Sequence, residues 1–411
     1  MTLADLKGKT AGVCVSGGLD SRTISKVLVE AGVNVIAFSA DVGQPDEKDI
    51  NDIRKRMAPC GVDTVIVDLK EEMAKACFEA IEAQAMYDGG YWNSTGIARA
   101  VTVRGLIPEM KKRKCTVLIH GATGRGNDQM RFERYTNVLA PSMRVYSPWR
   151  DAELLKRFPG RTQMVEFLAK YGIKAFVGTK KKYSTDSNLA GLSHEAEDLE
   201  SMETSMLIVK PTMGVWPQEA PDKVEKFTVR FEKARAVQIN GKDVTPLEAM
   251  LLANKIGGRN GIGMKHALEN RIIGTKSRGV YEAPGMEVLA TALRYLYQAT
   301  MDRRATLLFM QLSKLVADQI YDGRYYDPAT QAARAAIGVF AKHATGTVEV
   351  GLYKGNIFFN ALSGCKATIY NEADSSMEAS NGLNPVSSQG FAEIQSVEAL
   401  MLAKAGQIVS K

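Results

Sequence analysis

The chain has 411 residues, of which 45% are hydrophobic and 24% charged, and its formal net charge is +7. This is the composition of a globular protein, long enough for two packed domains. No stretch approaches the ~18 uninterrupted apolar residues of a membrane span, and the early acid Asp5 is atypical of a signal peptide. The five cysteines are odd in number, scattered and never in a CxxC pair, which predicts reduced thiols in a cytoplasm and no zinc or cluster site. The positive charge suits anionic small molecules, and without a basic-aromatic stripe nucleic acid is the less favoured partner.

The first part of the chain alternates short apolar runs with helical patterns. The runs that predict strands are 10–15, 33–38, 64–67 and 116–119. The patterns that predict helices are one with Ile24, Val27 and Leu28 on a single face, then 46–57, 71–85 and 97–112. Strands separated by helices of this length predict a parallel sheet with helices on both faces. The near-continuous apolar character of the strands agrees with burial on both faces.

Beyond about residue 175 the pattern becomes α+β. A segment at 200–222 with three prolines is irregular. The predicted strands are 227–237, 348–353 and 357–362, with tight turns at Asn240-Gly241 and Lys354-Gly355. The predicted helices are 246–255, 286–300, 303–321 and a short amphipathic one at 397–409. The predicted fold class is therefore α/β, with a parallel-sheet domain over 1–175, an α+β domain over 176–380 and a C-terminal helical tail over 381–411.

The sharpest local motif is Ser16-Gly17-Gly18-Leu19-Asp20-Ser21, between the first strand and the first helix. Two adjacent glycines let the backbone approach an anion, and the helix that follows directs unpaired N–H groups at it. Asp20 beside a phosphate would be repulsive unless a divalent cation lies between them. The expected ligand is therefore Mg²⁺ with the phosphates of a nucleotide. The chain has no Walker or dinucleotide-binding fingerprint.

This motif resembles the S-G-G-x-D-[ST] pyrophosphate loop of the N-type ATP pyrophosphatases, which adenylate an acceptor oxygen and release pyrophosphate. The argininosuccinate synthase family within that superfamily usually reads S-G-G-L-D-T-S, and here Ser21-Arg22 replaces the final Thr-Ser. The hydroxyl of Ser21 is retained, and a guanidinium at Arg22 can still meet phosphate.

A second motif follows the fourth predicted strand, over 120–133. Its three glycines, Thr123, Asn127 and Asp128 offer amides, donors and acceptors, and Arg131 offers a fork for a carboxylate. Loops at the carboxyl ends of parallel strands bind ligands in such folds. The segment resembles the G-[AS]-T-x-K-G-N-D-x-x-R-F signature of the same family, with Arg125 in place of Lys.

Further motifs occur in family order. The segment 183–195 resembles Y-S-x-D-x-N…G-x-[ST]-x-E, although Ala190 stands where family members often have Trp. The segment 269–282 resembles E-N-R…G-x-K-S-R-G-x-Y-E, 91–96 resembles the loop beside citrulline, and 40–44 follows the second predicted strand where adenine and ribose lie.

The resemblance implies a site for each substrate. For ATP it implies Cys14, Val15, Ser16, Gly17, Gly18, Leu19, Asp20, Ser21, Arg22, Ala40, Gly121 and Asp186. For citrulline it implies Tyr91, Thr95, Asn127, Arg131, Ser184, Ser193, Glu195, Glu269 and Tyr281. For aspartate it implies Thr123, Asn127 and Asp128, and the residues expected to take part in catalysis are Asp20, Asp128 and Arg131.

The resemblance also implies an activity. Citrulline's ureido oxygen attacks the α-phosphate of ATP in the presence of Mg²⁺, giving citrullyl-AMP and pyrophosphate, and aspartate then displaces AMP. It implies an ATP-pyrophosphatase-type nucleotide-binding domain at 1–175, with the adenine nucleotide alpha-hydrolase-like fold. It further implies a synthetase and multimerisation domain at 176–380, an oligomerisation tail at 381–411, a homotetramer and a cytoplasmic location. Asp128 is a candidate for deprotonating the amine of aspartate.

Two alternatives stay open. A tRNA-modifying member of the superfamily would suit the basic charge, but such enzymes usually need a reactive cysteine pair or a CxxC metal site. A nucleotide-binding paralogue without turnover is supported only by the departures at Arg22 and Ala190. Amidotransferase members are disfavoured because residue 2 is Thr rather than an N-terminal cysteine and no glutaminase domain fits in the length.

Overall fold

The computed structural model describes residues 1–174, 183–378 and 382–408. Internal contacts divide the chain into two units, Met1–Ala367 and Thr368–Lys411. The domain boundaries predicted after residues 175 and 380 lie outside the described residues. Among the residues that are described, no helix is both long and apolar enough to cross a bilayer.

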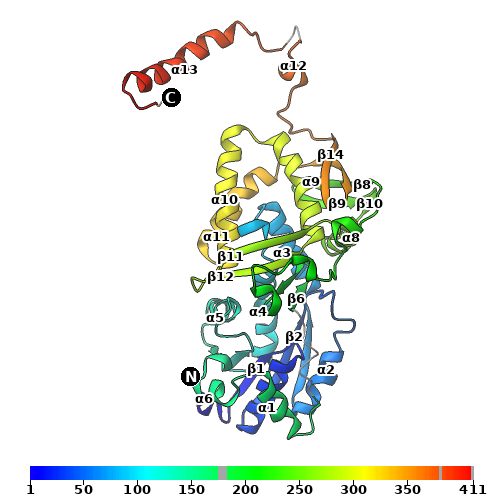
Figure 1. The fold of residues 1–411 in the computed structure, drawn as a ribbon, viewed down its shortest axis with the longest axis vertical. Helices are drawn as coiled ribbons and strands as arrows, with labels where there is room; N and C mark the ends of the chain where they lie inside the picture. The colour runs from blue at the N-terminus through cyan, green and yellow to red at the C-terminus, as the bar shows by residue number, and fades with distance from the viewer. Residues whose placement is uncertain (175–182, 379–381, 409–411) are drawn as a thin grey trace. The chain divides into compact units, whose positions relative to one another are not determined.

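The first unit begins with a five-stranded parallel sheet in the order β3-β2-β1-β4-β5 (Figure 1). Its strands are β1 (Thr10–Cys14), β2 (Asn34–Asp41), β3 (Asp63–Asp68), β4 (Val117–His120) and β5 (Arg144–Tyr146). The helices of this part are α1 (Leu19–Glu30), α2 (Asp52–Met57), α3 (Lys70–Glu82), α4 (Ser94–Lys112), α5 (Asp128–Leu139), α6 (Ala152–Arg157) and α7 (Arg161–Ala169). The predicted alternation of strands and helices around a parallel sheet is confirmed.

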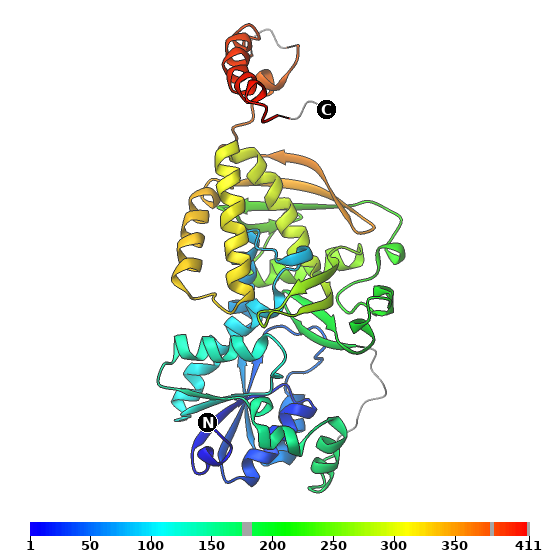
Figure 2. The same ribbon diagram turned by 60° about the vertical axis from the view of Figure 1, so that its left-hand side comes forward.

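Both faces of this sheet are buried. Val13 of β1 packs with Val27 of α1 in one apolar cluster, whereas Phe38 of β2 and Leu118 of β4 belong to a second cluster that includes α3 and α4. The sheet therefore lies between two layers of helices (Figure 2). This explains why its strands are near-continuous apolar runs instead of alternating ones.

The order of the strands reverses at β1. The chain passes from β1 to β2 and β3 on one side, then returns to β4 and β5 on the other. Because β1 and β4 are neighbours, with Cys14 opposite His120, the loops after these two strands open at the same edge of the sheet. Ligands of such folds bind outside the carboxyl ends of the strands at this point of reversal. The topology thus brings segments 15–18 and 121–127 together.

The helix predicted at 46–57 is shorter in the structure, where α2 begins at Asp52. The preceding residues form a loop in which the Asp49 carboxylate accepts from the backbone N–H of Asn51 at 2.9 Å. Another acid of the loop, Asp46, accepts from the hydroxyl of Ser187 on a distant strand. Such side-chain bonds compete with helix formation, so the charged periodicity alone was misleading here.

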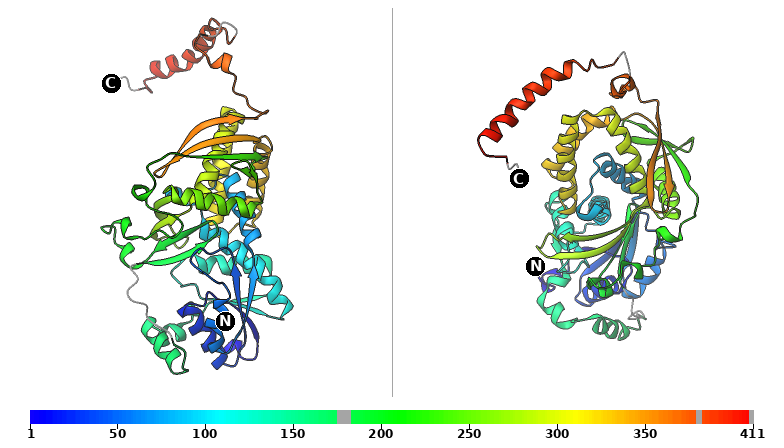
Figure 3. Two further views of the ribbon diagram at one scale, coloured as in Figure 1. Left: turned by 90° about the vertical axis from the view of Figure 1, so that its right-hand side faces the viewer. Right: turned by 45° about the horizontal axis from the view of Figure 1, so that its top comes forward.

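Two antiparallel sheets complete the first unit, as the α+β pattern predicted. One has the order β11-β12-β7-β6 and the other β10-β9-β8-β13-β14. Their strands are β6 (Ser184–Asn188), β7 (Gly191–Glu195), β8 (Glu225–Glu232), β9 (Arg235–Ile239), β10 (Lys242–Asp243), β11 (Met264–Asn270), β12 (Lys276–Glu282), β13 (Gly346–Tyr353) and β14 (Asn356–Ser363). Helices α8 (Pro246–Arg259) and α9 (Pro284–Thr300) pack together, as do α10 (Arg303–Tyr321) and α11 (Pro328–Ala341) (Figure 3).

The single strand predicted at 227–237 is wrong, because the chain forms the hairpin β8–β9 there. Lys233 and Ala234 have φ values of +49° and +65°, so the backbone reverses at two residues that carry no glycine or asparagine signal. The turn predicted at Asn240-Gly241 is confirmed, with φ values of +50° and +79°. The hairpin predicted around residue 354 is confirmed as β13–β14.

The second unit contains α12 (Glu372–Ser375) and α13 (Ser387–Lys404). The helix predicted at 397–409 therefore begins earlier, at Ser387, and Val409 lies outside the described residues. Its apolar side chains Phe391, Ile394 and Leu400 are all more than half exposed within this chain. Such an uncovered apolar face is typical of a helix that packs against a partner.

Candidate functional site

The loop between β1 and α1 leaves the start of α1 without a side-chain cap. Gly17 has a φ of +73°, and Gly18 is the N-cap residue of α1, which it cannot cap because it has no side chain. The hydroxyl of Ser21 accepts from the backbone N–H of Ser16 at 3.0 Å and lies 3.4 Å from the hydroxyl of Ser16. The first N–H groups of α1 therefore remain available to an anion.

The charged residues of this loop differ in what they can contact. Burial raises the pKa of Asp20, against the opposing effect of Arg161. Arg22 donates to the backbone carbonyls of Lys174 at 3.0 Å and Gly18 at 3.4 Å, so its guanidinium group is already engaged within the chain. Its predicted contact with phosphate thus competes with these two bonds.

The apolar side chains of the predicted nucleotide loop are buried in the interior of the protein. Val15 and Leu19 are buried in the cluster beneath the loop, so only their backbone can face a ligand. Burial raises the pKa of the Cys14 thiol to about 12, which keeps it neutral. Ala40, at the end of β2, is buried too, and its carbonyl accepts from the side chain of Gln44 at 2.9 Å.

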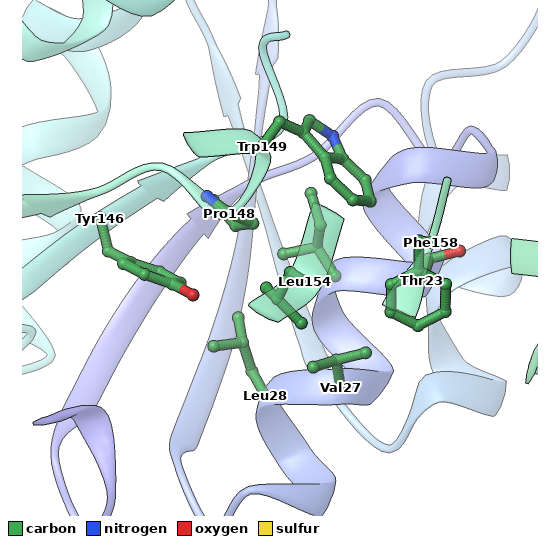
Figure 4. A pocket seen from close by; sticks show the side chains of 9 residues that line it. Thr23, Val27, Leu28, Tyr146, Pro148, Trp149, Leu154 and Phe158 are labelled. Atoms are coloured by element: carbon green, nitrogen blue, oxygen red, sulfur yellow. The ribbon is translucent and has the colours of Figure 1, made fainter. Parts of the chain in front are cut away.

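The outer side of α1 is fixed by the segment that follows β5. Figure 4 shows Pro148, Trp149 and Leu154 facing Val27 and Leu28 of α1. The apolar cavity among them has a volume of about 10 Å³, room for no more than about one water molecule. This packing holds the helix that presents the loop.

The second loop approaches the start of α1 closely. A Cβ atom on Gly121 would lie 3.2 Å from Ile24 and 3.8 Å from Asp20, both on α1, so the absence of a side chain lets the loops approach closely. His120 is fully buried at the start of this loop, and burial lowers its pKa to about 4. The neutral ring accepts from the backbone N–H of Ala122 at 3.3 Å and stacks on Phe132. The histidine supports the loop, in which Thr123 is exposed.

Ion pairs connect this loop to the second sheet. Arg99 of α4 donates to Asp128 at 2.8 Å and to Asp186 of β6 at 2.6 Å, and Arg131 donates to Asp128 at 2.9 Å. Burial alone would raise the pKa of Asp128, but Arg99 and Arg131 hold it below its usual value. The pKa of Asp186 is raised by burial, with Arg99 opposing. Asp128 is therefore a poor proton acceptor, and the geometry favours a role in binding over the deprotonation of an amine.

The second sheet aligns several predicted residues across its strands. Asp186 of β6 lies opposite Ser193 of β7, which lies opposite Tyr281 of β12. Ser184, which is exposed, lies opposite Glu195 two register positions along, on the same face. Because opposed residues share a face of a sheet, these side chains gather on one surface.

Stacked aromatic rings enclose this surface. Tyr91 and Tyr281 stack with ring centroids 4.0 Å apart, and the hydroxyl of Tyr91 accepts from the backbone N–H of Thr95 at 3.0 Å. The ring of Tyr281 lies along its strand over Gly279, where a Cβ atom would be 2.3 Å from the tyrosine hydroxyl. The glycine thus makes room for the ring, which extends toward Glu269.

Two carboxylates face this surface. Burial raises the pKa of Glu269, and its hydrogen bonds with Tyr321 and Tyr281 oppose that shift. Burial and the nearby Glu269 raise the pKa of Glu195 to about 7, and the closest cation, Arg271, is 3.8 Å away. A pair of acids with raised pKa values is typical of a functional site, because a cationic ligand would relieve their repulsion.

The structure also brings in residues that the sequence did not indicate. Arg99 lies one helical turn after Thr95, and that i, i+4 spacing is the signal that could have revealed it. Arg56 of α2 contacts the first loop, with its Nη2 atom 3.5 Å from the carbonyl of Ser16. Tyr321, at the end of α10, accepts from the side chain of Asn127 at 2.8 Å, and no local pattern marks it.

The predicted residues fall into two adjoining groups. The nucleotide group lies at the edge of the parallel sheet, on the loops after β1, β2 and β4. The second group lies between α4, α5 and the sheet β11-β12-β7-β6, and Asp128 and Asp186 connect the two through Arg99. Arg99 therefore joins the two groups, and both lie in the first unit.

Comparisons with known proteins show the family to which the chain belongs. Residues 11–174 match the family model described as Arginosuccinate synthase N-terminal HUP domain, and residues 183–402 match the Arginosuccinate synthase C-terminal domain. The chain is 37% identical over 390 residues to argininosuccinate synthase of Rhodopirellula baltica, covering 94% of this chain and 96% of the relative. It is 38% identical over 403 residues to that of Thermotoga maritima, covering 96% and 97%. The chain therefore belongs to the argininosuccinate synthase family.

Proposed function

We propose that this chain joins citrulline to aspartate, cleaving ATP to AMP and pyrophosphate, as a carbon–nitrogen ligase of arginine biosynthesis. One observation of the second group of residues, between α4, α5 and the sheet β11-β12-β7-β6 and called the substrate group from here on, carries the proposal. Among the described residues, Nη2 of Arg131 and Oε2 of Glu269 are buried without a hydrogen-bond partner. Unpaired buried charged atoms are costly, and a ligand that pairs with both removes the cost. An α-amino acid offers the matching carboxylate and ammonium groups.

The proposed subsites follow the two groups of residues. ATP would bind along Cys14–Arg22, near Ala40 and Gly121, with Asp186 at its inner end. Citrulline would lie between the stacked pair Tyr91 and Tyr281 and the polar groups of Thr95, Asn127, Arg131, Ser184, Ser193, Glu195 and Glu269. Aspartate would be bound by Thr123, Asn127 and Asp128. The engaged guanidinium of Arg22 gives that residue the weakest support of the set.

With the three substrates in these subsites, the proposed reaction has two chemical steps. In the first, the ureido oxygen of citrulline bonds to the α-phosphorus of ATP, and the bond to pyrophosphate breaks. In the second, the amine of aspartate attacks the activated ureido carbon, AMP leaves with the former ureido oxygen, and the nitrogen gives up a proton. Neither step needs a covalent bond to the protein, so orientation of the three substrates supplies much of the rate.

The first loop fits a magnesium ion bound together with nucleotide phosphates. Asp20 lies in the first turn of α1, and its raised pKa is that of a buried carboxylate that a cation would stabilise. Mg²⁺ takes carboxylate and phosphate oxygens together, and when bound it offsets the charge that grows on departing pyrophosphate. Ser16, Ser21 and the open N–H groups of α1 would hold the same phosphates.

We extend the proposal to the rest of the chain. Residues 1–175 would bind the nucleotide, 176–380 would complete the synthetase site, and 381–411 would join subunits of a homotetramer in the cytoplasm. The exposed apolar residues of α13 support the last assignment, because they need a cover that their own unit does not supply. Sizing with light scattering tests it: a tetramer that dissociates when residues 381–411 are removed supports it, and a monomer of the full chain refutes it.

Release of AMP and pyrophosphate from Mg-ATP tests the activity, with citrulline and aspartate supplied together and each omitted in turn. We expect pyrophosphate only when citrulline is present, and argininosuccinate only when aspartate is added as well. Pyrophosphate release that is independent of citrulline would contradict the proposed first step. ATP binding without any citrulline-dependent pyrophosphate would instead indicate a nucleotide-binding paralogue without turnover.

A further inference from the structure

The C-terminal end of α10 enters the substrate group at Tyr321. This residue is 1% exposed, although it is the last residue of its helix. Its hydroxyl accepts from Nδ2 of Asn127 at 2.8 Å, and its backbone carbonyl accepts from Nε of Arg131 at 2.9 Å. Asn127 and Arg131 of the proposed citrulline site therefore both contact this one tyrosine, and the Glu269 carboxylate lies close enough to influence the pKa of its hydroxyl.

The direction of these hydrogen bonds is determined. Oδ1 of Asn127 accepts from the backbone N–H of Ile272 at 3.0 Å, so the nitrogen of the amide must face Tyr321. Since the tyrosine oxygen accepts from that amide, its own proton remains available to the neighbouring Glu269 carboxylate, which is acceptor-only when ionised. Burial raises the pKa of Tyr321, which keeps this proton in place. The three polar groups therefore lie in the order Asn127, Tyr321 and Glu269.

Two neighbouring side chains pack against the ring of Tyr321. The ring stacks on Tyr87 with centroids 3.8 Å apart and an interplanar angle of 13°, and the guanidinium of Arg131 lies 5.0 Å from its centroid. The hydroxyl of Tyr87 in turn donates to the carbonyl of Asn270, beside Glu269, at 2.9 Å. The hydroxyl of Tyr321 is thus placed by contacts that do not depend on the hydroxyl itself.

We propose that Tyr321 is a positioning residue for citrulline. Its hydroxyl fixes the Asn127 carboxamide and the Glu269 carboxylate relative to each other. It leaves the second N–H of Asn127 and Oε2 of Glu269 directed to the substrate. The role rests on the proposed function, because it acts through two residues assigned to citrulline. A tyrosine that fills space only would have no effect on binding through its hydroxyl.

The test compares Tyr321→Phe with a matched control, Tyr297→Phe. Both changes remove one buried hydroxyl, but the hydroxyl of Tyr297 donates to the carbonyl of Glu82, and its ring packs against Phe309, neither of which is a proposed site residue. We expect Tyr321→Phe to raise KM for citrulline about tenfold, the effect of a lost hydrogen bond to a charged group. KM for ATP should change less than about twofold, and the control should leave both constants near the wild-type values.

A double-mutant cycle separates positioning from general loosening of the fold. If the hydroxyl acts through Asn127, Tyr321→Phe should have less than about a third of its effect on KM for citrulline when combined with Asn127→Ala. Equal effects in both backgrounds, or an increase in KM for ATP as large as that for citrulline, would overturn the inference. Wild-type protein without citrulline-dependent pyrophosphate release would refute the proposed function itself, so the two failures are distinguishable.

Discussion

Replacing Arg99 by methionine tests the electrostatics at the junction of the two groups of residues. The methionine keeps most of the volume but removes the charge that Asp128 and Asp186 share at 2.8 Å and 2.6 Å. Removing one partner of a buried ion pair lowers the free energy of unfolding by about 3–5 kcal/mol, because the other charge stays buried and unpaired. The Arg99 side chain is 19% exposed and that of Asp186 34%, so solvent screening favours the lower end, about 3 kcal/mol.

The loss of folding stability caused by Arg99→Met should depend on pH. In the wild type, Arg99 and Arg131 depress the pKa of Asp128 against burial. A depressed carboxyl pKa contributes stability that is present above the unfolded value and is lost as the pH falls through the folded one. In Arg99→Met that contribution weakens, and Asp186, whose pKa is already raised, protonates more easily. The difference in unfolding free energy should therefore be largest near pH 7.5 and shrink toward about pH 5.

Urea unfolding at the two pH values, followed by tryptophan fluorescence, measures this difference. Lys111→Met is the control, since it removes an exposed positive charge from the same helix and should change stability by less than about 0.5 kcal/mol. A difference below about 1 kcal/mol at pH 7.5, or one that is equal at both pH values, would refute the reasoning from the shared ion pair.

Three further changes are predicted. Gly17→Ala should raise KM for ATP about tenfold while leaving KM for citrulline unchanged, because φ is +73° there and the new Cβ atom would lie 2.7 Å from Arg56; initial rates at varied ATP measure it. Ionised Glu195 attracts an ammonium group, so kcat/KM for citrulline should rise with pH through the pKa of about 7, and Glu195→Gln should flatten that profile. A persistent rise in the variant would assign the titration to another group. Gly279→Ala should displace the ring of Tyr281 and raise KM for citrulline with little effect on ATP, and unchanged citrulline kinetics would show that the ring does not bound the subsite.

Local patterns were sufficient to predict the geometry of the first loop. A strand, two glycines and a helix are contiguous, and the geometry at Gly17 and Gly18 follows from a few neighbouring residues. The parallel sheet could be predicted equally well from the sequence, because strands buried on both faces must be nearly all apolar. The hairpin β8–β9 was missed because Lys233 and Ala234 adopt positive φ values without the residues that favour them.

The contacts within the substrate group could be recognised only in the folded structure. Tyr321 contacts Arg131 across a separation of 190 residues, and Arg99 contacts Asp186 across 87, so no window of sequence contains either pair. Motifs indicated candidate ligand-binding segments, but they did not show that Asp128 is paired with two guanidinium groups. That pairing is a property of the packing of α4 against α5, and it determines what the carboxylate can do.

Transfer of oxygen tests the proposed reaction most directly. Citrulline labelled with ¹⁸O at the ureido oxygen would be incubated with unlabelled Mg-ATP and aspartate, and the products analysed by mass spectrometry. If the ureido oxygen bonds to the α-phosphorus and leaves with AMP, the label should appear in AMP, while pyrophosphate stays unlabelled. Unlabelled AMP formed together with argininosuccinate, or label in pyrophosphate, would contradict activation of citrulline as its adenylate.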